Sequence, residues 1–149
     1  MGNDKAPTLT EFLLARIAER EAVARAATYG PWRYNPAKVN AIDRSESVFA
    51  GKPGTMAITV ASTGPSDDPQ SMSDAAHIAL HDPARILAEC AAKRAVIKAA
   101  WSDHCLIEGE WGGGQSQGAM SAKNDNPAVV EALASVYADH PDFQEEWRP

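Results

Sequence analysis

The chain has 149 residues, a formal net charge of −6 and 44% hydrophobic residues, values that suit one folded domain. The negative charge argues against a nucleic-acid partner, because phosphate backbones are bound by clustered Lys and Arg side chains. No apolar run approaches the ~20 residues needed to span a bilayer, and the N-terminus lacks a signal peptide's basic and apolar regions. We therefore expect a single cytoplasmic domain over residues 1–149, without a membrane partner.

A capping box predicts the start of the first helix. Thr8 and Glu11 stand three residues apart, so the hydroxyl and the carboxylate can each accept a hydrogen bond from a free backbone N–H. Apolar residues then recur at spacings of three and four until Pro31, which cannot continue the hydrogen-bond ladder. The sequence therefore predicts an amphipathic helix over about residues 9–27.

Three short segments rich in aromatic and β-branched residues predict a small antiparallel sheet. Residues 51–54, Gly-Lys-Pro-Gly, are a suitable hairpin connection between the second and third segments. The polar run that follows has too few apolar groups to pack, so we expect a flexible loop over about residues 62–72. The three segments are residues 32–34, 47–50 and 56–60.

Two helices are predicted to meet at Asp82. Ser73 or its neighbour Asp74 can cap a short helix that runs to about residue 81. Asp82 then caps a longer helix, because Pro83 occupies the first helical position, where no N–H is needed. Its apolar stripe continues to about residue 100.

The C-terminal third of the chain predicts one further helix and a docked tail. Asn126-Pro127 opens the helix by the same cap-and-proline pattern, and the helix ends before His140. The Gly-rich and Ser-rich segment before it predicts a second flexible loop, over about residues 109–126. Two aromatic residues in the last seven predict that the tail packs on the domain. In total we expect an α+β fold that is mainly helical, with three main helices, one short helix and an antiparallel sheet of two or three strands.

Three histidines suggest a metal site. His77 and His81 lie four residues apart on one predicted helix, so both imidazoles point from the same face, as helical metal ligands do. His140 falls at another helix end and can supply a third zinc ligand, with a thiol or water as the fourth. The alternative is that His81 only caps its helix, where a protonated imidazole meets the negative end of the helix dipole. The sequence leaves both interpretations open.

A partner or ligand surface is a third interpretation. Arg85 follows Asp82 by one helical turn and can orient an anion there, or it can form a salt bridge with Asp82 or Glu89. Trp147 and Arg148 in the tail combine an aromatic ring with a charge, as residues at protein interfaces do.

The sequence offers no complete catalytic set. Cys105 has His104 beside it, but neighbouring side chains point in different directions and do not make a nucleophile and base. The run Gly112-Gly113-Gly114 lacks the Gly-Lys-Ser/Thr ending of a phosphate loop. These absences favour a non-enzymatic protein without a cofactor, zinc being the alternative.

Three separated motifs resemble one known family. The motifs are Ala24–Ala27 with Gly30-Pro31-Trp32, His77–Leu87 with Ala92-Lys93-Arg94, and Tyr137–Pro149. Together they are similar to an uncharacterised actinobacterial family, domain of unknown function 6221, which also occurs in phages. The resemblance covers most of the chain, includes all three candidate zinc ligands and implies no activity. Residues 102–126 depart most from the pattern.

These observations favour a function in protein–protein interaction. The partner would be a host protein, met in the host cytoplasm, if the chain is phage-encoded, or a second copy of the chain. The alternatives are a zinc-binding protein or metal-dependent enzyme that uses the three histidines, and a structural role as a minor particle component.

Overall fold

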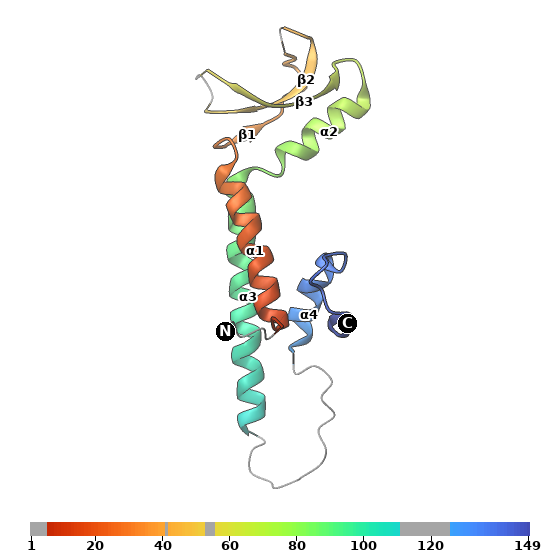
Figure 1. Ribbon diagram of the computed structural model, residues 1–149. Helices are drawn as coiled ribbons and strands as arrows, with labels where there is room; N and C mark the ends of the chain where they lie inside the picture. The colour runs from red at the N-terminus through yellow and green to blue at the C-terminus, as the bar shows by residue number, and fades with distance from the viewer. Residues whose placement is uncertain (1–5, 41, 53–55, 111–125) are drawn as a thin grey trace, which may run out of the picture. The chain divides into compact units, whose positions relative to one another are not determined.

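The structure is a computed structural model that describes residues 6–40, 42–52, 56–110 and 126–149. Over these residues the chain forms four α-helices and one three-stranded antiparallel sheet (Figure 1), which confirms the expected α+β, mainly helical fold. The chain divides into two compact units, which we describe separately. The first unit is Met1–Glu19 with Ala91–Pro149, and the second unit is Arg20–Cys90. The single domain expected from the length stays a prediction.

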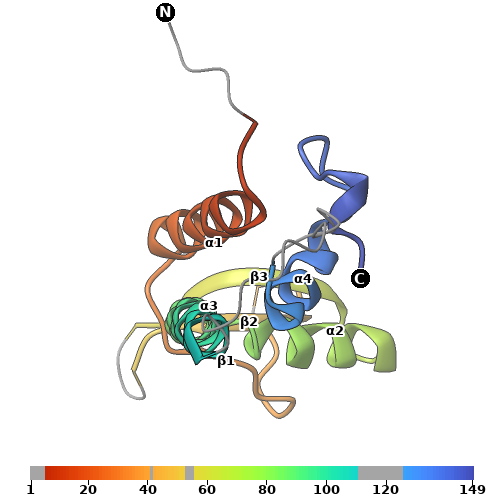
Figure 2. The same ribbon diagram turned by 90° about the horizontal axis from the view of Figure 1, so that it is seen from below.

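The sheet lies in the second unit. Its strands β1 (Trp32–Arg33), β2 (Ser45–Ala50) and β3 (Ile58–Pro65) follow one another in the order β1-β2-β3. Helix α2 (Pro69–Ala79) runs along the strands, as Figures 1 and 2 both show. Val48 of β2 and Ala75 of α2 are fully buried, so the core of this unit lies between the sheet and α2.

The loop expected over residues 62–72 is wrong, because these residues complete β3 and begin α2. Ser62 pairs with Ser47 across the two strands. The Thr63 hydroxyl donates to the carbonyl of Ser71 at 2.6 Å and so ties the end of β3 to α2. Hydrogen bonds among polar side chains and the backbone hold residues 62–72 in place. The small number of apolar residues in this segment therefore did not indicate a loop.

Helix α2 begins four residues before the predicted Ser73. The Asp68 carboxylate accepts hydrogen bonds from the backbone N–H groups of Gln70 and Ser71, both at 3.2 Å, and Pro69 takes the first helical position. Asp68-Pro69 thus starts α2 by the same cap-and-proline pattern as Asp82-Pro83 at the start of α3.

The first unit contains most of α1 (Leu9–Ala26), and the predicted capping box is confirmed. The Thr8 N–H donates to the Glu11 carboxylate at 2.8 Å, and the Glu11 N–H donates to the Thr8 hydroxyl at 3.2 Å. The apolar face of the helix is buried as its spacing predicts at Leu9, Phe12, Leu13 and Ile17, whereas Val23 of the same apolar series is 72% exposed.

Helix α3 (Pro83–Glu110) runs further than the predicted end near residue 100. The Trp101 indole N–H donates to the Thr10 hydroxyl at 3.0 Å and fixes this turn within the first unit. The Ser102 hydroxyl donates to the Lys98 carbonyl and stays within the helix. The helix therefore covers the start of the loop expected over residues 109–126, most of which lies outside the described residues.

Helix α4 (Ala128–Ala134) is shorter than predicted and gives way to a 3-10 turn, Ser135–Tyr137. Its N-cap is Pro127 without any side-chain hydrogen bond, so the expected cap by Asn126 is wrong. The backbone N–H groups of the first turn donate instead to the Pro127 carbonyl. The packed tail is confirmed, because Trp147 in the 3-10 turn Glu145–Trp147 is only 4% exposed.

Candidate functional site

Asp82 connects two elements of the second unit through its carboxylate. Oδ1 accepts a hydrogen bond from the Ala84 N–H at 2.8 Å, which confirms the predicted cap of α3. Oδ2 accepts one from the Trp32 N–H at 2.7 Å and so holds the start of β1. A Cβ atom at Gly30 would collide with this carboxylate, which explains the glycine at that position. Asp82 therefore serves the fold with both of its oxygens.

The other predicted surface residues have partners within the chain. The Arg85 guanidinium lies 3.2 Å from the Glu89 carboxylate, so its ion pair is with Glu89. Arg148 is exposed and pairs with Glu145 at 2.6 Å. Trp147 lies in the core of the first unit instead of on its surface, because it packs against the rings of Phe12 and Phe143 with centroid distances of 5.2 and 5.6 Å.

The structure brings His77 and His81 together at the end of α2. Both side chains are exposed, and their ring centroids are 4.6 Å apart. The Nδ1 atom of His81 lies 2.9 Å from the His77 carbonyl oxygen and must donate to it, since a carbonyl only accepts. The His81 ring thus satisfies a carbonyl of the last turn of α2, directly after the C-cap residue Leu80. The bond also leaves the other ring nitrogen, Nε2, with its lone pair when the imidazole is neutral.

His140 belongs to the first unit, where other residues engage its ring. The Arg16 guanidinium contacts the ring nitrogens, and the Asp142 backbone N–H donates to Nδ1 at 3.1 Å. The ring also packs edge-on against Phe12 at 5.5 Å. Among the described residues, no group of three or more His, Cys, Asp or Glu side chains is placed to hold a metal ion. The zinc site with His140 stays a prediction.

Neither cysteine of the chain adds a described functional site. Cys90 is a free thiol buried in the second unit, where it serves as a small apolar residue. The side chains of His104 and Cys105 lie outside the part that the structure describes.

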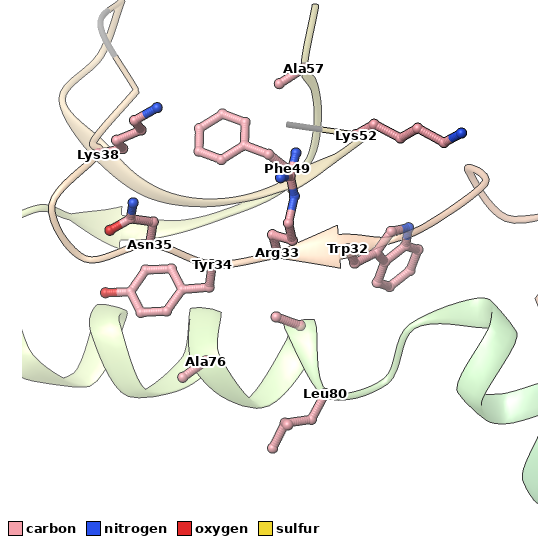
Figure 3. Close-up of a pocket in the computed structure, with 11 residues that line it drawn as sticks. Trp32, Arg33, Tyr34, Asn35, Lys38, Phe49, Lys52, Ala57, Ala76 and Leu80 are labelled. Atoms are coloured by element: carbon pink, nitrogen blue, oxygen red, sulfur yellow. The ribbon is translucent and has the colours of Figure 1, made fainter. Parts of the chain in front are cut away.

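Sequence reasoning missed a pocket of ≈ 740 Å³ beside β1, the edge strand of the sheet (Figure 3). Its size falls within the roughly 300–1,000 Å³ typical of ligand sites. The lining also includes Ala76 and Ala79 of α2, and Leu80, Asn35 and Ala57. The larger side chains that line it are three aromatic ones, Trp32, Tyr34 and Phe49, and three cationic ones, Arg33, Lys38 and Lys52.

The pocket, which we call the β1 pocket, extends around both faces of the edge strand. Neighbouring side chains of a strand point to opposite faces. Tyr34 accordingly lies on the side of α2, whereas Arg33 points to the opposite face with Phe49, as Figure 3 shows. The Arg33 guanidinium also donates to the Gly51 carbonyl, which holds its side chain across the sheet.

The electrostatics of the β1 pocket differ from those of the whole chain. No Asp or Glu is among its lining residues, although the chain has a net charge of −6. Burial, and the Glu46 carboxylate beside it, raise the pKa of Tyr34, so the phenol keeps its proton at neutral pH and can donate a hydrogen bond. Glu46 itself is 1% exposed and lies beneath the pocket surface instead of lining it.

A signal for the β1 pocket was present in the sequence. The 20 acidic residues leave two long gaps, residues 22–42 and 47–66, and the three cations of the pocket fall inside these gaps. The net charge of the whole chain does not reveal segments that lack acidic residues.

The structure describes an α+β protein with a pocket of cationic and aromatic lining residues in its sheet-bearing unit. The sequence matches a family described as "Family of unknown function (DUF6221)" over residues 6–149, so the chain belongs to this family. This match confirms the family that the three motifs resemble. Comparison with curated proteins and with solved structures found no match. Within the described residues, no helix is long and apolar enough to cross a membrane.

Proposed function

We propose that this protein acts by binding another protein, and that the β1 pocket receives an acidic segment of that partner. The observation that carries the proposal is the charge of the pocket, which has three cations and no acid in a chain of net charge −6. The net charge of the chain repels a distant acidic partner, whereas the cations of the pocket attract its acidic groups at short range. Local complementarity of this kind fixes where a partner docks and in which orientation.

The aromatic residues of the pocket indicate that the partner segment is apolar as well as acidic. Trp32, Tyr34 and Phe49 are each partly exposed, so a ligand can cover surface that they still present to water. Tyr, Trp and Arg carry much of the binding energy at protein interfaces. Contact with the rings therefore supplies affinity, while the cations select the acidic groups.

The class of partner depends on the origin of the chain. If the chain is phage-encoded within actinobacteria, the segment belongs to a host protein in the host cytoplasm. If it is not, a second copy or another cellular protein presents the segment. The structural alternative is a minor particle component, and the oligomeric state of the purified protein, measured by light scattering, bears on it.

Charge reversal inside and outside the pocket tests the proposal. The probe is a fluorescent peptide of alternating Glu and Phe, with a Lys and Phe peptide as its charge-inverted counterpart. We expect the chain to bind the acidic peptide only, and Lys38→Glu to weaken binding about tenfold because it reverses one close charge. Lys98→Glu makes the same change at an exposed position of α3 that does not line the pocket and should leave affinity unchanged.

Two results would refute the pocket as the docking site. One is equal binding of the two peptides. The other is an equal loss of affinity in Lys38→Glu and Lys98→Glu, which would show that only overall charge matters.

A further inference from the structure

The histidine pair at the end of α2 has the geometry of a metal-binding half-site. His77 and His81 are one helical turn apart, both exposed, with ring centroids 4.6 Å apart. Two imidazoles at this spacing can direct one nitrogen each toward a common ion at about 2.0–2.1 Å. The pair lies outside the set of residues that line the β1 pocket.

The hydrogen bond of His81 favours metal binding. Its Nδ1 donates to the His77 carbonyl, which fixes the tautomer and orients the ring. Metal-ligating histidines usually donate their second ring nitrogen in this way, to a carbonyl or carboxylate. The same hydrogen bond can therefore satisfy the end of α2 and orient His81 as a metal ligand. Capping of the helix by His81 and metal binding by His81 are compatible.

We propose that His77 and His81 form half of a tetrahedral zinc site, which the same two residues of a second copy complete. Zinc in a closed site takes four nitrogen or sulfur ligands, and one chain offers two here. Within the described residues no third ligand joins them. A two-fold axis through the ion brings four imidazoles together, since identical chains pair most simply by such an axis.

The proposal departs from the zinc site predicted from sequence, because His140 takes no part in it. The Asp142 N–H donates to Nδ1 of His140, which uses the one lone pair of a neutral imidazole, and the other ring nitrogen then carries the hydrogen. The Arg16 guanidinium lies against the same ring nitrogens, so neither is open to a metal ion.

One nearby charge limits the affinity. Arg20 lines the same small pocket as His81, and its positive charge opposes a second cation. We therefore expect zinc to bind more weakly than at a closed four-ligand site within one chain, and dimer formation to depend on protein concentration as well as on zinc.

The experiment uses untagged full-length protein, zinc titration calorimetry and light scattering. We expect one zinc ion for two chains, a doubling of mass on zinc addition, and its reversal by EDTA. His77→Gln and His81→Gln should each weaken zinc binding at least about tenfold, because each removes a ligand. His140→Gln is the matched control, since Gln can still accept hydrogen bonds from Arg16 and Asp142, and it should bind zinc as the wild type does.

Three outcomes would overturn the proposal. They are no zinc uptake, a chain that stays monomeric at saturating zinc, or equal losses in all three Gln variants, the last of which would restore the three-histidine site. Lys38→Glu separates the two proposals, because it should weaken binding of the acidic peptide about tenfold and leave zinc binding intact.

Discussion

The two units differ in the kind of residue that they bury. Among the described residues of the first unit, the buried ones are apolar or aromatic, and four rings surround that of Phe12 at centroid distances of 5.2 to 6.4 Å. Among those of the second unit, four polar residues are buried, three of them consecutive on β2. These polar residues are Ser45, Glu46, Ser47 and Ser71.

The difference determines where a ligand can bind. Tightly packed aromatic rings leave little room and few polar groups to orient a ligand. A sheet that ends in a two-residue strand exposes its edge, and the second unit accordingly has the β1 pocket with its cations. The first unit therefore serves mainly stability, whereas the second unit carries both candidate sites.

Phe12→Ala should give the largest loss of stability. It removes the ring that Tyr137, Phe143 and Trp147 contact, and truncating a buried Phe costs about 3–5 kcal/mol. Urea denaturation measures the loss, and hydrogen exchange shows which unit opens first. Val23→Ala is the control on the same helix, because Val23 is 72% exposed and its loss should cost under about 0.5 kcal/mol. Equal losses would contradict the apolar account of the first unit.

Asp82→Ala should give the next largest loss and act on the second unit. The change removes the cap of α3 and leaves the Trp32 N–H without its partner, which together cost about 2–3 kcal/mol. Asp82→Asn keeps one acceptor oxygen and should lose less. Urea denaturation of both variants measures the order. If Asn and Ala were equivalent, the hydrogen bonds would not be the cause.

The sequence predicted those parts of the structure that depend on neighbours within one helical turn. The capping box of Thr8 and Glu11 and the cap by Asp82 are of this kind, and both are confirmed. The packed tail was also predicted, because Phe143 and Trp147 are costly to leave in water.

The parts that the sequence did not predict depend on contacts between distant residues or on polar groups. The polar residues Ser62 and Thr63 at the end of β3 predict a loop, because they bury little apolar surface. In the structure Ser62 pairs with β2, and the Thr63 hydroxyl bonds to α2. The sequence did not predict the β1 pocket, because its lining residues come from separate segments, among them β1, β2 and α2. Only folding brings these segments together. No periodicity of a single element reports such a site.

Glu46→Gln tests whether the buried Glu46 carboxylate of the second unit acts on Tyr34, and the expected change is spectroscopic. Gln has the same shape but no charge, so the pKa of Tyr34 should fall, while burial still keeps it above the ordinary value of 10.0. Ultraviolet absorbance of the phenolate during alkaline titration measures this shift. Tyr34→Phe identifies which of the three tyrosines is responsible. An unchanged titration of Tyr34 would show that the Glu46 carboxylate does not act on it.

The smallest effect is expected in acid and concerns the start of α2. Hydrogen bonds from the Ser71 hydroxyl and the Gln70 N–H hold the pKa of Asp68 below its ordinary value of 3.8. The carboxylate is therefore more acidic in the folded chain than in the unfolded one, and its contribution to stability is complete above the unfolded pKa and is lost as pH falls through the folded pKa. The free energy of unfolding should fall below about pH 4 less steeply in Asp68→Asn than in the wild type. Asp74→Asn, an exposed change on the same helix, should follow the wild type. If Asp68→Asn also followed the wild type, polar capping would not stabilise the second unit, and the contrast between the units would rest on burial alone.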